Sequence, residues 1–122
     1  MASSRAGIVR GFLLIEVVLF ALASLLHHGL PSEQYAHARA AVAEGVIALV
    51  LAFGLAICVY QPSHTRIAAL ITQSIAMFGV AIAVVMNLAG AGPRNIFDYT
   101  VHVVMLVTLW LGLLAARRVA YL

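Results

Sequence analysis

The sequence contains no lysine, a single cysteine and few charged residues of any kind. Only 9% of its 122 residues are charged, whereas a soluble domain has about 25%. The lone cysteine, Cys58, has no partner for an internal disulfide, so disulfides do not stabilise this fold. The scarcity of charge argues against an ordinary soluble domain and favours an integral membrane protein, as does the 65% share of hydrophobic residues.

All basic residues are arginines, and they lie at the ends of apolar runs rather than in a dense cluster with aromatic residues. Although the net charge is +3, this distribution argues against nucleic-acid binding. We therefore expect the lipid bilayer to be the main partner. The sequence is also compatible with a homo-oligomer or with a larger membrane complex.

Four apolar segments dominate the chain, and each is near the roughly 20 residues that a helix needs to cross a bilayer. They cover residues 7–28, 36–60, 66–88 and 96–119. Glycine, proline and serine separate the runs, as in "GAGPRN" at 90–95. Because backbone polar groups inside a bilayer need internal partners, the runs should be helices. The sequence predicts an all-α protein with one domain over residues 1–122, an antiparallel four-helix transmembrane bundle with short connections.

The arginines also predict an orientation. One side of the membrane would carry five of the seven: Arg5, Arg10, Arg66, Arg117 and Arg118. The other side would carry Arg39 and Arg94. Since arginine is enriched in cytoplasmic segments, both termini should be cytoplasmic. The first connection, which His27, His28 and His37 flank, should then face outward.

This topology brings polar residues from all four helices to the outward side. Taking about 1.5 Å of rise per residue, Glu44 and His102 lie within about 4 Å of each other in depth. A carboxylate inside a span is costly, at least about 2.5 kcal/mol at the centre, so it should face a partner or a water-filled cavity. We expect Glu44 and His102 to turn inward and to form a hydrogen-bonded pair, with or without a metal ion.

Imidazole and carboxylate groups are ligands for transition metals, so the first functional hypothesis is a site for zinc, copper or iron. Its candidate ligands are His28, His37, Glu44, Asp98 and His102. Other candidates for the pocket or for a polar pathway are Glu16, His27, Gln73, Asn87 and Arg94. The spacing matches no named metal motif, and the sequence leaves open which of His27 and His28 faces the interior.

Several alternatives remain. Haem could be held by His102 with His28 or His37, although no histidine matches them on the other side of the membrane. A ladder of acidic and histidine side chains could conduct protons or ions. Another alternative is an accessory or structural subunit with no chemistry of its own, in which the terminal histidines are solvated at headgroup level. Whatever the function, we expect Arg94 to pair with Asp98 and cap the fourth helix, rather than to contact an anion or a lipid headgroup. No nucleophile–base arrangement is visible, so no enzymatic reaction is assigned.

Four stretches carry a resemblance: "LLHHG", "HARAAVAEGVIALVL", "QSIAMFG" and "GPRNIFDYTVH". Together they resemble a group of small bacterial four-span membrane proteins with no assigned function. The resemblance covers nearly the whole chain and implies a multi-pass protein of the bacterial inner (plasma) membrane. It directs attention to His28, His37, Glu44, Gln73, Arg94, Asp98 and His102, and it implies no activity.

Overall fold

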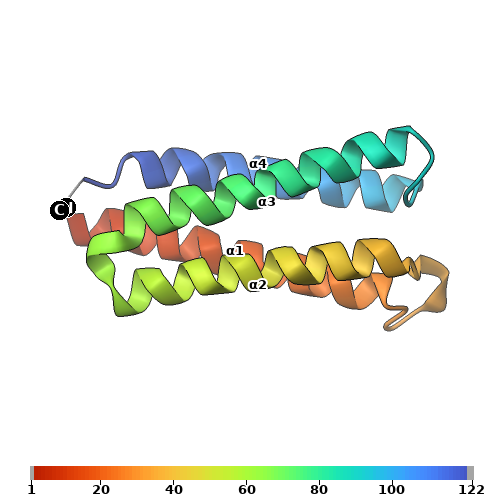
Figure 1. Ribbon diagram of the computed structural model, residues 1–122, viewed down its shortest axis with the longest axis horizontal. Coiled ribbons are helices and arrows are strands. Elements are labelled where there is room, and N and C mark those ends of the chain that lie inside the picture. The colour runs from red at the N-terminus through yellow and green to blue at the C-terminus, as the bar shows by residue number, and fades with distance from the viewer. Residues whose placement is uncertain (1, 121–122) are drawn as a thin grey trace.

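The computed structural model describes residues 2–120, which form four long helices and two short 3-10 turns. The elements are α1 (Ala2–His27), η1 (Glu33–Tyr35), α2 (Ala38–Tyr60), η2 (Pro62–His64), α3 (Thr65–Leu88) and α4 (Ile96–Arg117). Successive helices run antiparallel, and α1 and α2 lie beside α3 and α4 (Figure 1). All four helices are long and apolar enough to cross a membrane, so the predicted fold class is confirmed.

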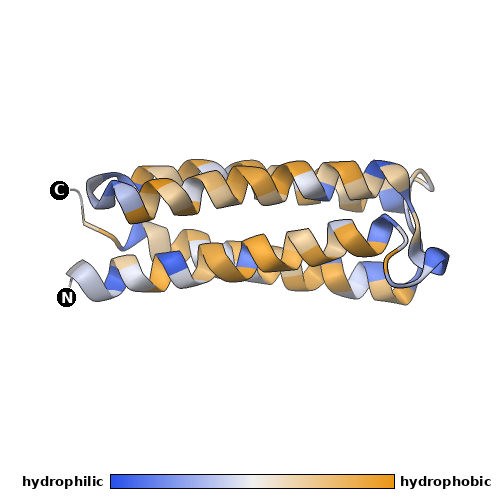
Figure 2. Ribbon diagram, turned by 90° about the horizontal axis from the view of Figure 1, so that it is seen from below, coloured by the Kyte–Doolittle hydropathy of each residue, from blue (hydrophilic) through white to orange (hydrophobic). Residues whose placement is uncertain are grey.

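The bundle has two chemically different ends. We call one the arginine end, where both chain termini and the connection 61–64 lie (Figure 1). The other is the histidine end, which contains the connections 28–37 and 89–95. Apolar residues dominate the length of the helices between these ends (Figure 2).

At the histidine end, α1 and α3 terminate in the same way. Gly29 and Gly90 have positive φ angles of 91° and 85°. The N–H of Leu30 bonds the carbonyl of Leu25, and the N–H of Ala91 bonds that of Met86. Together with bonds from the glycine N–H groups, these contacts form Schellman caps, which require a left-handed residue that glycine adopts without strain. These glycines therefore end both helices at a defined residue.

Small residues fill much of the bundle interior, and large aliphatic residues point outward. Buried positions include Ala41, Ala48, Ala69, Ala76 and Ala116. Large exposed residues such as Leu49 and Phe78 are 72% and 69% exposed. Small residues allow close helix packing where hydrophobic association does not drive folding, and outward aliphatic residues suit contact with lipid chains. The packing is therefore that of a membrane bundle.

Candidate functional site

His27 occupies the centre of a buried hydrogen-bonded cluster at the histidine end. It is the last residue of α1, and its ring lies between two carboxyl groups. Its Nδ1 is 2.6 Å from Oε2 of Glu44, and its Nε2 is 2.8 Å from Oδ1 of Asp98. All three side chains are buried. We call these three residues the His27 cluster; it joins α1, α2 and α4.

The two hydrogen bonds of the His27 cluster set the smallest number of protons that it holds. Each of the two N···O contacts needs one proton, whether the nitrogen or the carboxyl group carries it. Three groups with two protons have the same total charge in every arrangement. An imidazolium with two carboxylates gives +1 − 1 − 1, and a neutral imidazole with one carboxylic acid gives 0 + 0 − 1. With these two protons alone, the cluster carries a net charge of −1.

Local structure places each member of the cluster. The Schellman cap at Gly29 turns the chain so that the N–H of His37 bonds the carbonyl of His27 at 2.8 Å. Between α1 and α2, the Ser24 hydroxyl donates to the carbonyl of Ala41 at 2.7 Å. On α4, the Asn95 side chain caps the helix by accepting from the N–H of Asp98 at 2.9 Å. Asp98 thus lies in the first turn, where the helix dipole favours a negative charge.

A second polar contact lies next to the cluster. Nδ2 of Asn87 is 3.5 Å from Nδ1 of His102, and both residues are buried. Glu44, Asn87 and His102 all line a small pocket of about 50 Å³ between α2, α3 and α4. A cavity of this size can hold a water molecule or a monatomic ion. Glu44 belongs to both the pocket and the His27 cluster, so it connects them.

A separate polar contact, the Glu16–Gln73 pair, lies deeper in the bundle. The Gln73 amide Nε2 donates to both carboxyl oxygens of Glu16, at 2.9 and 3.0 Å. Both side chains are fully buried. Gly112 faces them from α4, and a Cβ there would collide with Gln73 Nε2 and Glu16 Oε1. The absence of a side chain at Gly112 therefore makes room for the pair.

Buried apolar side chains occupy the levels between the Glu16–Gln73 pair and the His27 cluster. They are Phe20 on α1, Ala48 on α2, Val80 on α3 and Met105 on α4. Along α1, Phe20 lies between Glu16 and His27, and along α3, Val80 lies between Gln73 and Asn87. The candidate ladder from Asp98 to Gln73 is thus interrupted by an apolar layer in this structure.

The remaining candidates lie outside the cluster. His28 is exposed, and its Nδ1 donates to the carbonyl of Ser24 at 2.7 Å. His37 is the N-cap of α2, and its Nδ1 accepts from the N–H of Ala40 at 3.2 Å. Arg94 is exposed in the connection before α4. The structure therefore brings His27, rather than His28 or His37, to Glu44 and Asp98.

Two expected pairings differ from those observed. The ion pairs within residues 2–120 both involve His27, so Asp98 pairs with His27 and not with Arg94. Asp98 faces the interior, whereas Arg94 belongs to the exposed turn. Glu44 bonds His27, and His102 contacts Asn87, in place of the expected Glu44–His102 bond. The sequence signal for His27 was its eleven-residue spacing from Glu16, which places both on one face of α1.

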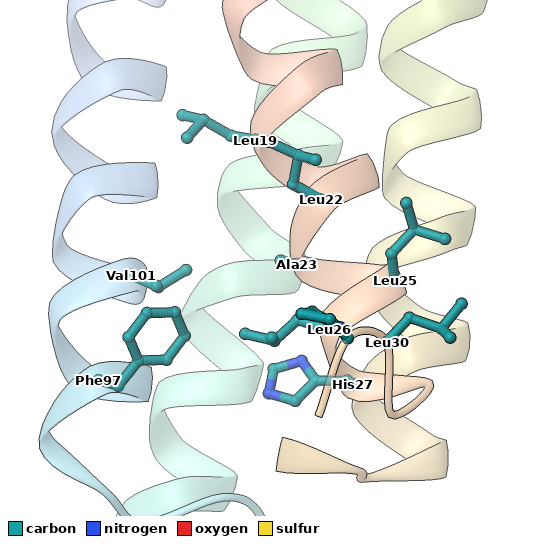
Figure 3. A pocket seen from close by; sticks show the side chains of 10 residues that line it. Leu19, Leu22, Ala23, Leu25, Leu26, His27, Leu30, Phe97 and Val101 are labelled. Atoms are coloured by element: carbon teal, nitrogen blue, oxygen red, sulfur yellow. The ribbon is translucent and has the colours of Figure 1, made fainter. Parts of the chain in front are cut away.

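An apolar groove of about 550 Å³ runs beside the cluster, between α1 and α4. Figure 3 shows Phe97 and Val101 facing the leucines of α1 across it, with the His27 ring near its end. Both nitrogens of His27 already bond carboxyl groups, so the groove offers a ligand little hydrogen-bonding capacity. Its lining suits lipid chains.

The donor set fits a metal ion only in part. Carboxylate and imidazole are suitable ligands, and Glu44 and His102 share the small pocket. However, no group of three His, Cys, Asp or Glu side chains in the described part of the chain is arranged to hold a metal ion.

Comparison of the chain with protein-family models, curated proteins and solved structures finds no match. The residues and their geometry therefore carry the functional argument.

Proposed function

We propose that this chain is a small multi-pass membrane protein that binds a small cation at the His27 cluster, and that the cation is a proton. The observation that carries the proposal is one imidazole held between two buried carboxyl groups. The bonded cluster has a net charge of −1, and the chain has no lysine to neutralise it. One more positive charge would make the cluster neutral, which a membrane interior favours.

The structure offers a position for that extra proton. Oδ2 of Asp98 is buried and has no hydrogen-bond partner among residues 2–120. A buried carboxylate oxygen without a partner is costly, and protonation removes its charge. The cluster lies at the end of the bundle, close to the aqueous phase, so it can exchange protons with one side of the membrane. Uptake of a proton there would couple the helix contacts of α1, α2 and α4 to pH on that side.

We further propose that this side is outside the cytoplasm and that the membrane is the bacterial inner membrane. Five arginines lie at the arginine end and two at the histidine end, which favours cytoplasmic termini. A reporter active only in the cytoplasm should give signal when fused after residue 122. A silent fusion there, with an active reporter inserted near Ser32, would reverse the orientation.

Infrared spectroscopy of the purified protein tests the proton proposal. Between about pH 5 and pH 8, a protonated-carboxyl band should decrease as protons leave the cluster. Asp98→Asn and Glu44→Gln should each alter that band, whereas Glu33→Gln, in the exposed connection, should not. An unchanged spectrum over this range in the folded wild-type protein would overturn the proposal and favour an accessory subunit without chemistry of its own.

A divalent transition-metal ion is the second candidate, because Glu44 and His102 line one pocket. It is tested by elemental analysis of the purified protein and by titration with zinc. Metal binding that Glu44→Gln and His102→Ala each abolish would favour this candidate over the proton. Binding that survives both substitutions would place the metal elsewhere.

A further inference from the structure

The arginine end carries positive charge that no acidic side chain offsets. Five arginines lie there: Arg5, Arg10, Arg66, Arg117 and Arg118. The chain has only four acidic residues, and three of them, Glu33, Glu44 and Asp98, are at the histidine end. The fourth, Glu16, is fully buried against Gln73. No acidic side chain therefore offsets the charges of Arg5 and Arg118, which can bind a negatively charged partner.

Hydrogen bonds hold several of these arginines without neutralising them. Three arginines donate to main-chain carbonyl oxygens: Arg5 to Arg118 at 3.0 Å, Arg10 to Cys58 at 3.0 Å, and Arg66 to Val119 at 2.7 Å. A carbonyl oxygen has no net charge, so the bond from Arg5 fixes that side chain and leaves its charge in place. The Arg5 bond also ties the first turns of α1 to the residue that follows α4.

A hollow of about 200 Å³ lies between Arg5 and Arg118. Arg5 and Ile8 line it from α1, and Ala115 and Arg118 line it from the C-terminal end of α4. Two guanidinium groups thus accompany an apolar wall at the boundary of the membrane-spanning region. Guanidinium groups bind phosphate oxygens through charge-assisted hydrogen bonds. Ile8, which is 55% exposed, extends the apolar wall along α1 toward the membrane interior.

We propose that this hollow binds the phosphodiester headgroup of an anionic phospholipid, with Arg5 and Arg118 on the phosphate and an acyl chain against Ile8 and Ala115. The combination of two cations and an apolar wall selects an amphiphilic anion. The position at the end of the spanning helices places the arginines at headgroup depth and the apolar wall at chain depth. This inference is independent of proton binding at the His27 cluster.

Native mass spectrometry of the full chain, titrated with phosphatidylglycerol or phosphatidylcholine, tests the site. The wild-type protein should bind phosphatidylglycerol more tightly. Each basic residue near an anionic surface contributes about fivefold to binding, so Arg5→Gln with Arg118→Gln should weaken phosphatidylglycerol binding roughly 25-fold. Circular dichroism checks that the double variant remains helical. A folded double variant with wild-type affinity would overturn the proposal.

The matched control is Arg39→Gln with Arg94→Gln, which removes the same charge from exposed positions at the histidine end. It should leave phosphatidylglycerol binding unchanged. An equal loss in both double variants would mean that net charge alone attracts the lipid, which contradicts a defined site. Inorganic phosphate is the probe for a free anion: if it displaces phosphatidylglycerol at equal concentration, the hollow binds phosphate rather than lipid, and the proposal fails.

Discussion

The His27 cluster and the Glu16–Gln73 pair represent two ways of burying a carboxyl group in a membrane bundle. In the cluster, ionisable groups from three helices hydrogen-bond one another beside a small pocket. In the pair, one carboxyl group meets a neutral amide and fits against Gly112. The first arrangement holds a net charge at the end of the bundle, and the second lies among apolar side chains at greater depth.

This difference suits the His27 cluster to proton exchange and the Glu16–Gln73 pair to helix packing. The cluster has several proton positions and a neighbouring cavity, as the proposed proton exchange requires. The pair has one ionisable group, and its fit depends on the missing side chain at Gly112. We therefore expect substitutions in the cluster to change both stability and proton binding, whereas substitutions at the pair should change stability alone.

The largest expected effect is that of His27→Ala. It removes the partner of Glu44 and Asp98 together and leaves two buried carboxyl groups close to one another. The cost should be about 3 kcal/mol, the lower end for breaking a buried ion pair, because protonation of the carboxyl groups limits it. Reversible unfolding in mixed micelles measures this free energy. A loss below that of Gly112→Val would contradict the central position of His27.

Gly112→Val should have the next largest effect and lower the free energy of unfolding by about 2 kcal/mol. The new side chain would overpack the space that Glu16 and Gln73 occupy. The infrared signal of the His27 cluster should be unchanged. Gly11→Ala is the control, because a Cβ there meets nothing within 4 Å. If Gly112→Val lowered the free energy of unfolding no more than Gly11→Ala does, Glu16 and Gln73 would not be tightly packed against Gly112.

Glu16→Gln should cost less, about 1 kcal/mol, because an amide at this position can still hydrogen-bond the amide of Gln73. Unfolding in micelles and the pH-dependent infrared difference spectrum are measured on the same sample. The spectrum should match that of the wild type. Loss of the proton-dependent band in Glu16→Gln would show that the deep pair, and not the cluster, releases the proton.

The smallest effects are expected at the other histidines of the histidine end. His28→Ala should change unfolding free energy by less than about 0.5 kcal/mol, because its side chain is exposed. His37→Ala should cost about 0.5–1 kcal/mol through the loss of the α2 N-cap. Zinc binding that either substitution abolishes would instead support the metal site predicted from the sequence.

The sequence predicted the fold because apolar runs, their glycine and proline breaks and the cost of exposed backbone all act locally. It also predicted that Glu44 and His102 face inward, since lipid exposure of such groups is costly. It could not predict the partners within the interior. His27 and His28 lie about 100° apart on α1, and the choice between them depends on how that helix is rotated against α2 and α4. The Arg94–Asp98 pairing failed for the same reason, because sequence proximity does not report which side chain the packing buries.

The contacts of His27 have a consequence for biosynthesis. Its bond to Glu44 lies within the α1–α2 hairpin, so it can form once the first half of the chain has entered the membrane. The bonds from His27 to Asp98 and from Glu16 to Gln73 both reach the second half. Helix α1 therefore bonds the second hairpin through two buried side chains, His27 and Glu16. In a nascent chain that ends near residue 61, we expect His27 to bond Glu44 already. Glu16 would still lack its hydrogen bonds from Gln73, which belongs to α3.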